Sequence, residues 1–124
     1  MASNKLQRFG PTLMVTGATG SNYINPAASG ANAVGYTSTA SYAIIRHIRV
    51  TNLTNATQGF SLFVGGTTGS ATGTAFMSNG SLVPATGSVD WYGALRLDAA
   101  DFLSGTAVSG SALVIEAEGE LGLA

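Results

Sequence analysis

The feature that most constrains the fold of this chain is the alternation of apolar and polar residues in short segments. The clearest segment runs from Gly87 to Gly105, GSVDWYGALRLDAADFLSG, where Val89 and Trp91 alternate with polar neighbours. A period of two residues is typical of a β-strand with one buried face. We therefore expect Trp91, the only tryptophan, to lie in the core. Asp98-Ala99-Ala100-Asp101 predicts a tight turn, because aspartate side chains bond nearby backbone N–H groups.

The longest strand pattern covers residues 41–52, SYAIIRHIRVTN. Arg46 interrupts the apolar face of this segment. Either a β-bulge that switches the alternation or an acidic partner across the sheet would accommodate it. Residues 58–64 alternate again, with Phe60 and Leu62 on one side. We expect these two segments to pair as a hairpin with a slightly long connection.

The remaining segments complete an all-β pattern. Asn79-Gly80 predicts a two-residue hairpin turn between short strands at 74–77 and 81–83. Residues 111–121 form the closing strand, in which the apolar positions should face inward and the three glutamates outward. No stretch has a capped helical period. About eight short strands predict a single β-sandwich or jelly-roll-like domain, covering residues 41–124.

Residues 1–40 differ from this domain. They are rich in small and polar residues, and their apolar clusters are short. We expect a short strand near 11–16 and otherwise an extended N-terminal arm. Such a segment buries too little apolar area to offset its ordering entropy, so it should order only against the body of the protein or a neighbouring subunit.

Composition excludes several classes of protein. Only 9% of the residues are charged, against roughly 25% on average, so neutral residues or another protein must cover the surface. A net charge of −1 disfavours nucleic-acid binding, and no apolar run approaches the ~18 residues of a membrane span. Without cysteine there is no disulfide or thiolate site. The N-terminus lacks an apolar signal region, so we expect the protein to be made and assembled in the cytoplasm.

The charges are segregated along the chain. Residues 1–62 carry four basic and no acidic residues, whereas residues 63–124 carry all six acids and one arginine. The acids Glu116 and Glu118 form an outward row to which Arg46 and Arg49 are natural complements. These opposite charges can pair within one fold or between subunits.

No constellation predicts catalysis. His47 is the only histidine, and the glycine-rich stretches lack the Gly-Lys-Ser/Thr of a phosphate loop. Glu116 and Glu118 would have Cα atoms about 6.6 Å apart on a strand, a separation that glycosidase carboxylates also use. A solvated charge row explains them better. We expect no catalytic residue, no cofactor and no metal. The aromatic residues Tyr42, Phe63 and Tyr92, if exposed, would suit a sugar-stacking platform and a contact with another protein equally well.

Four segments resemble a set of small virion proteins of tailed bacteriophages: IIRHIRVTN (44–52), GFSLFVG (59–65), DWYGALRLDAADFLSG (90–105) and ALVIEAEGELG (112–122). The resemblance covers roughly residues 41–122, and its most specific elements are D-W-Y-G and L-D-A-A-D-F-L. It implies a β-sandwich that decorates or cements the capsid, often as a trimer between capsomers, without an active site. Related domains occur in head fibres and tail parts.

Together these observations predict a non-enzymatic virion structural protein, and we favour a capsid cement or decoration protein located on the capsid surface. Its expected partners are the major capsid protein and further copies of itself, with a trimer favoured. The alternatives are a tail, collar or head-fibre component and, from another class, a carbohydrate-binding module. The candidate assembly-interface residues are Lys5, Arg8, Phe9, Tyr23, Arg46, Arg49, Glu116 and Glu118.

Overall fold

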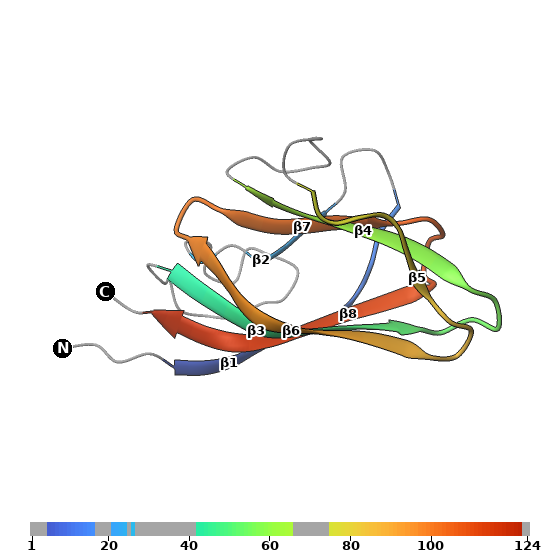
Figure 1. Cartoon of the computed structure of the whole chain (residues 1–124), viewed down its shortest axis with the longest axis horizontal. Helices are drawn as coiled ribbons and strands as arrows, with labels where there is room; N and C mark the ends of the chain where they lie inside the picture. Colours follow the sequence, from blue (N-terminus) through green and yellow to red (C-terminus); the bar gives the residue numbers. More distant parts are fainter. Residues whose placement is uncertain (1–4, 17–20, 25, 27–41, 66–74, 123–124) are drawn as a thin grey trace.

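The computed structural model describes residues 5–16, 21–24, 26, 42–65 and 75–122. In these residues the chain is all-β, with eight strands in two four-stranded sheets and no helix (Figure 1). The strands are β1 (Lys5–Leu13), β2 (Ser21–Ile24), β3 (Tyr42–Asn52), β4 (Gln58–Gly65), β5 (Ala75–Val83), β6 (Ser88–Asp98), β7 (Phe102–Ala107) and β8 (Leu113–Gly122). The predicted β-sandwich is confirmed.

The two sheets are built from nested strand pairs. One sheet has the order β1-β8-β3-β6 and the other β2-β7-β4-β5. The pairs β1–β8, β2–β7, β3–β6 and β4–β5 are all antiparallel, so each pair encloses the next along the chain. Only β4 and β5 are consecutive strands of one sheet; every other connection crosses from one sheet to the other.

The core lies between the two sheets, where the inward positions of each strand meet. The largest fully buried side chains are Tyr23, Phe9, Phe60, Met14, Ile24, Ile45, Ile48, Leu62, Leu97, Leu103, Leu113 and Leu121. Trp91 is only half-buried, because β6 is an edge strand. Its ring packs edge-on against Phe76, with centroids 5.1 Å apart. Trp91 therefore lies at the margin of the core, whereas the sequence predicts a position inside it.

A β-bulge in β3 explains how Arg46 is accommodated. Ala43 and Ile45 are buried on one side of it, and Ile48 and Val50 on the other, so the alternation switches by one residue. The register confirms this: Ile45 pairs with Gly119 of β8 and His47 with Glu118, which leaves Arg46 as the extra residue. The β-bulge and the acidic partner predicted for Arg46 are both present, since Arg46 also contacts Glu120 of β8.

Two predicted hairpins are wrong. β3 and β4 do not pair, because the connection between them crosses from one sheet to the other. Asn79-Gly80 lies within β5, which continues from Ala75 to Val83. The register of β5 against β4 jumps from Ser81 to Met77 across two β4 residues, so an irregularity in the strand takes up the residues of the expected turn.

The N-terminal segment is part of the sandwich in its described residues. β1 starts at Lys5 and pairs with β8, and β2 pairs with β7. Phe9, Met14, Tyr23 and Ile24 are fully buried in the core, and this apolar burial orders the segment against the body. The strand expected near 11–16 is thus longer and earlier, and the sandwich does not begin at residue 41. Residues 27–40 of the expected arm lie outside the described residues.

Candidate functional site

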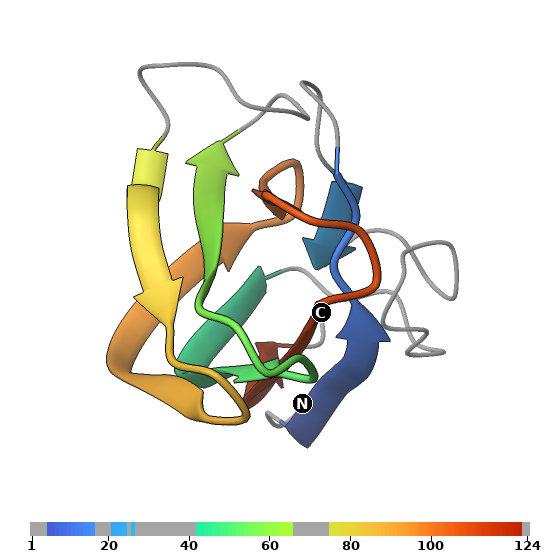
Figure 2. The ribbon, with the colours of Figure 1, turned by 90° about the vertical axis from the view of Figure 1, so that its right-hand side faces the viewer.

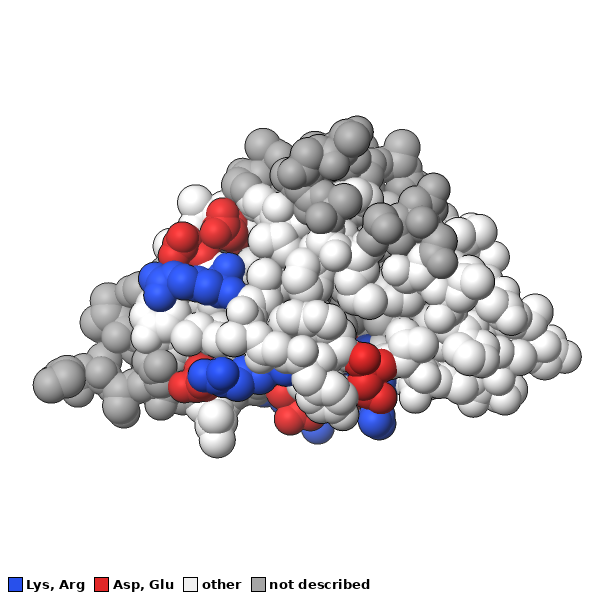
Figure 3. Space-filling view, in the orientation of Figure 1, with Lys and Arg blue, Asp and Glu red and all other residues white. Residues whose placement is uncertain are grey.

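The charged residues are concentrated on one of the two sheets. Ten lie in the sheet β1-β8-β3-β6, which we call the charged sheet, and Asp101 lies in the turn that follows β6. The sheet β2-β7-β4-β5 has no charged residue, and we call it the neutral sheet. Figure 3 shows basic and acidic side chains interspersed along the lower surface of the molecule, over the charged sheet.

The centre of the charged sheet carries a row of four side chains, one from each strand. The register places Arg8 of β1 beside Glu118 of β8, Glu118 beside His47 of β3, and His47 beside Tyr92 of β6. The imidazole of His47 stacks on the Tyr92 ring with centroids 4.6 Å apart. Its Nδ1 lies 3.7 Å from the Glu118 carboxylate. Its Nε2 lies 2.6 Å from the Asp90 carboxylate, to which the ring N–H donates.

Asp90 holds a second partner on the same face. Arg49 donates from Nε to Asp90 Oδ1 at 2.7 Å and from Nη2 to Oδ2 at 3.3 Å, a two-point contact. The hydrogen bonds from Arg49 and His47 lower the pKa of Asp90 below its ordinary value. The same contact with Asp90 raises the pKa of Arg49. On the side of β3 that faces β8, Arg49 lies in register with Glu116.

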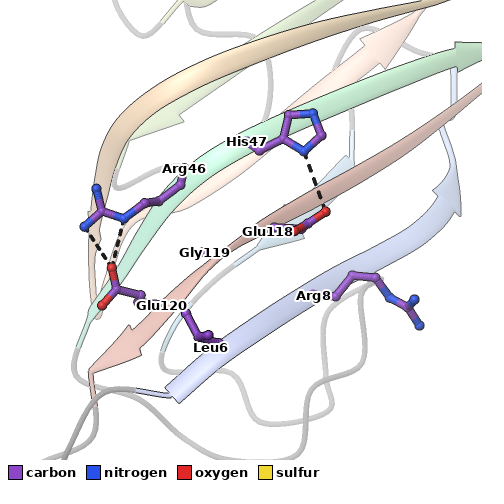
Figure 4. A pocket seen from close by; sticks show the side chains of 7 residues that line it. All are labelled: Leu6, Arg8, Arg46, His47, Glu118, Gly119 and Glu120. Carbon is purple, nitrogen blue, oxygen red and sulfur yellow. Dashed lines mark hydrogen bonds and ion pairs between the residues drawn. The ribbon is translucent and has the colours of Figure 1, made fainter.

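A shallow groove of about 350 Å³ lies on this face where β1, β8 and β3 run side by side. Arg46 donates from Nε to Glu120 at 2.9 Å, and its Nη2 lies 2.8 Å from the same carboxylate oxygen. The groove is lined by Leu6, Arg8, Arg46, His47, Glu118, Gly119 and Glu120. Figure 4 shows the Arg46 and His47 contacts to β8 within the groove, and the guanidinium of Arg8 pointing out of it.

The charged face is therefore largely paired within one chain. Arg46, Arg49 and His47 of β3 each contact an acid of a neighbouring strand, and Arg96 contacts Asp98 within β6. The arginine side chains of these pairs are about half exposed, so solvent screening leaves each pair little effect on stability. No group of three or more histidine, aspartate or glutamate side chains is placed to hold a metal ion in the residues that the structure describes.

Five of the eight predicted interface residues come together on this face: Arg8, Arg46, Arg49, Glu116 and Glu118. Lys5 begins β1 beside Leu121, but its side chain lies outside the described part of the structure. The predictions for Phe9 and Tyr23 are wrong. Both side chains are 1% exposed, because they point inward from β1 and β2 into the core, where no partner chain reaches them.

Tyr23 has a structural role that its sequence position did not suggest. Its hydroxyl accepts a hydrogen bond from the Val15 N–H at 3.3 Å and lies 3.4 Å from the Gly105 carbonyl, to which it donates. Burial raises the pKa of the Tyr23 hydroxyl. The residue thus ties the segment after β1 to β7 through the edge of the neutral sheet.

Sequence reasoning also missed two polar residues. Asp90 was not assigned to Arg49, since the pairing of β3 with β6 was not predicted. Asn52 is 2% exposed at the end of β3 and joins two loops. Its amide nitrogen donates to the carbonyls of Ala56 and Val83 at 2.8 and 3.1 Å, and its oxygen accepts from the Thr54 N–H at 2.8 Å. A polar residue at the boundary between a strand and a Thr-Asn-rich loop was the available signal.

The three aromatic residues of the possible sugar platform do not share one surface. Tyr42 and Tyr92 belong to the charged sheet, whereas Phe63 belongs to β4 of the neutral sheet. Arg96 already covers the Tyr42 ring, with its guanidinium carbon 4.4 Å from the ring centroid. Tyr92 remains 71% exposed.

No protein-family model matches the chain, and neither a curated protein nor a solved structure matches it significantly. In the part of the chain that the structure describes, no helix has the length and apolar character to cross a membrane.

Proposed function

We propose that this chain is a non-enzymatic structural protein of a tailed-bacteriophage virion, where it decorates and cements the capsid surface. Its partners are the major capsid protein and further copies of itself, with a trimer as the favoured form. The observation that carries the proposal is the nested strand order. From the pairs β1–β8, β2–β7, β3–β6 and β4–β5 we infer a jelly roll, an architecture that viral capsid proteins use.

Two further features support the proposal. The four segments that resemble phage virion proteins coincide with β3, with β4, with most of β6 and β7 and the turn between them, and with β8, so the resemblance concerns the framework of the sandwich. The surface also suits permanent assembly. One sheet carries no charge, and on the other sheet the charges are largely paired within the chain, so little uncompensated charge is desolvated on contact.

The test uses the full chain, because removal of residues 1–40 would delete β1, β2 and four core side chains. Purified protein is added to particles of the source phage that lack it. The proposal predicts density at regular lattice sites of the head in a cryo-electron microscopy map and a higher rupture temperature of the particle. Density confined to the tail, collar or fibres would instead assign the protein to that part of the virion. Absence of binding anywhere on the particle would refute the virion assignment.

One observation favours a second candidate, a carbohydrate-binding module. The ring of Tyr92 is 71% exposed beside the Arg49–Asp90 pair, and an aromatic face with nearby charged hydrogen-bonding groups is suited to stacking a sugar. Jelly rolls also occur in lectins. A glycan array separates the two candidates: a module should bind a saccharide that Tyr92→Ala no longer binds, whereas a cement protein should bind none.

A further inference from the structure

Five of the seven large apolar side chains that are exposed in the described structure lie at one end of the sandwich. We call this end the apolar tip; its members are Leu13, Val15, Leu53, Leu82 and Val108, and each is between 43% and 69% exposed. Figure 2 looks onto this end, where the loops after β3, β5 and β7 meet the segment that follows β1.

Backbone contacts hold these residues close together. The Val108 N–H donates to the Gly59 carbonyl at 2.9 Å, and Leu82 lies opposite Gly59 in the β4–β5 register. A Cβ atom on Gly59 would lie 3.1 Å from Val108 and 3.6 Å from Leu82, so these two side chains flank the glycine. The Val15 carbonyl accepts from the Ala107 N–H at 2.9 Å, and the Leu53 N–H donates to Ala112 at 2.8 Å.

The apolar tip is free of charge. The segments that build it, residues 9–16, 50–65, 75–89 and 102–115, contain no lysine, arginine, aspartate or glutamate. In Figure 3 the right-hand end of the molecule accordingly carries no blue or red side chain. Docking through this end would remove apolar side chains from water without desolvating any ionised group.

The tip is also rigidly built. Asn52 bridges the β3–β4 and β5–β6 loops, and the Thr86 N–H donates to the Thr54 carbonyl at 2.8 Å. The positive-φ residues other than glycine in the described chain are Thr86, at 54°, and Ser111, at 56°, and both lie in loops of this end. Such conformations cost energy and cluster at functional sites, and a loop that is already fixed loses little entropy on binding.

We propose that the apolar tip is the surface through which the protein docks onto the capsid shell, against an uncharged, apolar patch of the shell protein. This inference rests on the proposed function. A second copy of this chain is a poorer occupant, because five side chains are few against the roughly 20–30 residues a side of a stable interface. On a lattice, an oligomer presents several tips at once, and avidity makes weak contacts sufficient.

The experiment compares lysine substitutions of exposed apolar residues at two places in the full chain. Leu82→Lys and Val108→Lys together place two charges on the tip, and Leu6→Lys places one on the charged sheet, where Leu6 is 88% exposed. Binding to undecorated particles of the source phage is measured by sedimentation. The tip variant should bind at least about tenfold more weakly, since an unpaired charge would be buried. Leu6→Lys should stay within about twofold of the parent.

Circular dichroism and thermal melting should confirm that all variants are folded. If the parent chain binds and Leu6→Lys weakens binding more than the tip variant, the tip inference is overturned and the cement proposal stands. If the parent binds nowhere on the particle, the cement proposal itself fails, and the tip loses its proposed partner. If the tip variant changes the mass of the protein in solution and binding is unaffected, the tip is a contact between copies, and the shell is excluded as its occupant.

Discussion

Arg46 is the residue of β3 without a register partner in β8, yet its guanidinium lies 2.8 Å from the carboxylate of Glu120 in that strand. One extra residue thus has two effects. It shifts the alternation of β3 by one residue, so that Ile45 before it and Ile48 after it both face the core, and it adds an outward-pointing cation to the charged sheet.

Deletion of Arg46 should leave a folded protein, whereas deletion of Arg49 should not. Without Arg46, Ile45 and Ile48 fall on the same face of a regular strand, so the core positions are kept and the loss should be about 1–2 kcal/mol. Without Arg49, Val50 and Asn52 turn to the opposite face. The two deletions remove the same residue type from one strand, and urea denaturation compares them. Equal stability of the two variants would contradict the bulge.

Asp90 should make the stability of the protein depend on acid pH. Its pKa is lowered in the folded state by Arg49 and His47, so its contribution is present above the ordinary aspartate pKa, near 4, and is lost as pH falls through the folded value. The parent should therefore be more stable than Asp90→Asn at pH 7. This difference in urea midpoint should shrink below about pH 4. A difference that is the same at pH 7 and pH 2.5 would argue against the contact.

Tyr23 should make the stability of the protein depend on alkaline pH. Because burial raises its pKa, the folded state keeps the proton that the unfolded chain loses, and stability falls as pH rises above about 10. Tyr23→Phe should cost about 1–2 kcal/mol at pH 7, since the Val15 N–H and the Gly105 carbonyl lose their partner.

The relative stability of parent and Tyr23→Phe, measured by denaturation at pH 7 and pH 11, should shift toward the variant at the higher pH. Tyr92→Phe, which removes the hydroxyl of an exposed tyrosine, is the matched control and should be nearly neutral at pH 7. A Tyr23→Phe variant that melts like the parent at pH 7 would refute the buried hydrogen bonds.

Asn52→Asp should destabilise the loops of the apolar tip. The change keeps the oxygen that accepts from Thr54 but replaces the amide that donates to the carbonyls of Ala56, Val83 and Pro84. A carboxylate facing these carbonyls should cost about 2–4 kcal/mol. Asn55→Asp, exposed in the same loop, is the control and should change stability by less than about 0.5 kcal/mol. Thermal melting of the two variants measures the difference.

The sequence was sufficient for the local features of the fold. Alternation identified β3, β4, β6 and β8, the inward face of β8, and the turn at Asp98–Asp101, where the Asp101 N–H donates to the Asp98 carbonyl at 2.9 Å. These features depend on which face of a strand is apolar and on the chemistry of single residues, both of which can be read along the chain.

The partners of the strands could not be read in this way. Alternation is the same whether a strand pairs with its neighbour in sequence or with a distant strand, so β3 and β4 were wrongly joined and Asp90 was missed as the partner of Arg49. The weak alternation of residues 5–24 likewise concealed that Phe9 and Tyr23 are core residues. Their burial follows from pairing with β8 and β7, which are distant in the chain.

The nested strand order also determines when the protein is able to fold during synthesis. Of the eight described strands β8 leaves the ribosome last, yet it lies between β1 and β3 in the charged sheet. Until it arrives, β1 has no strand to pair with, and Phe9 stays exposed on the nascent chain. The innermost pair, β4 and β5, closes the shortest loop and is the first that can form, whereas contacts between distant segments slow folding. Completion of the sandwich therefore waits for β8, and a ribosome stalled before Leu113 would hold a chain without the centre of its sheet.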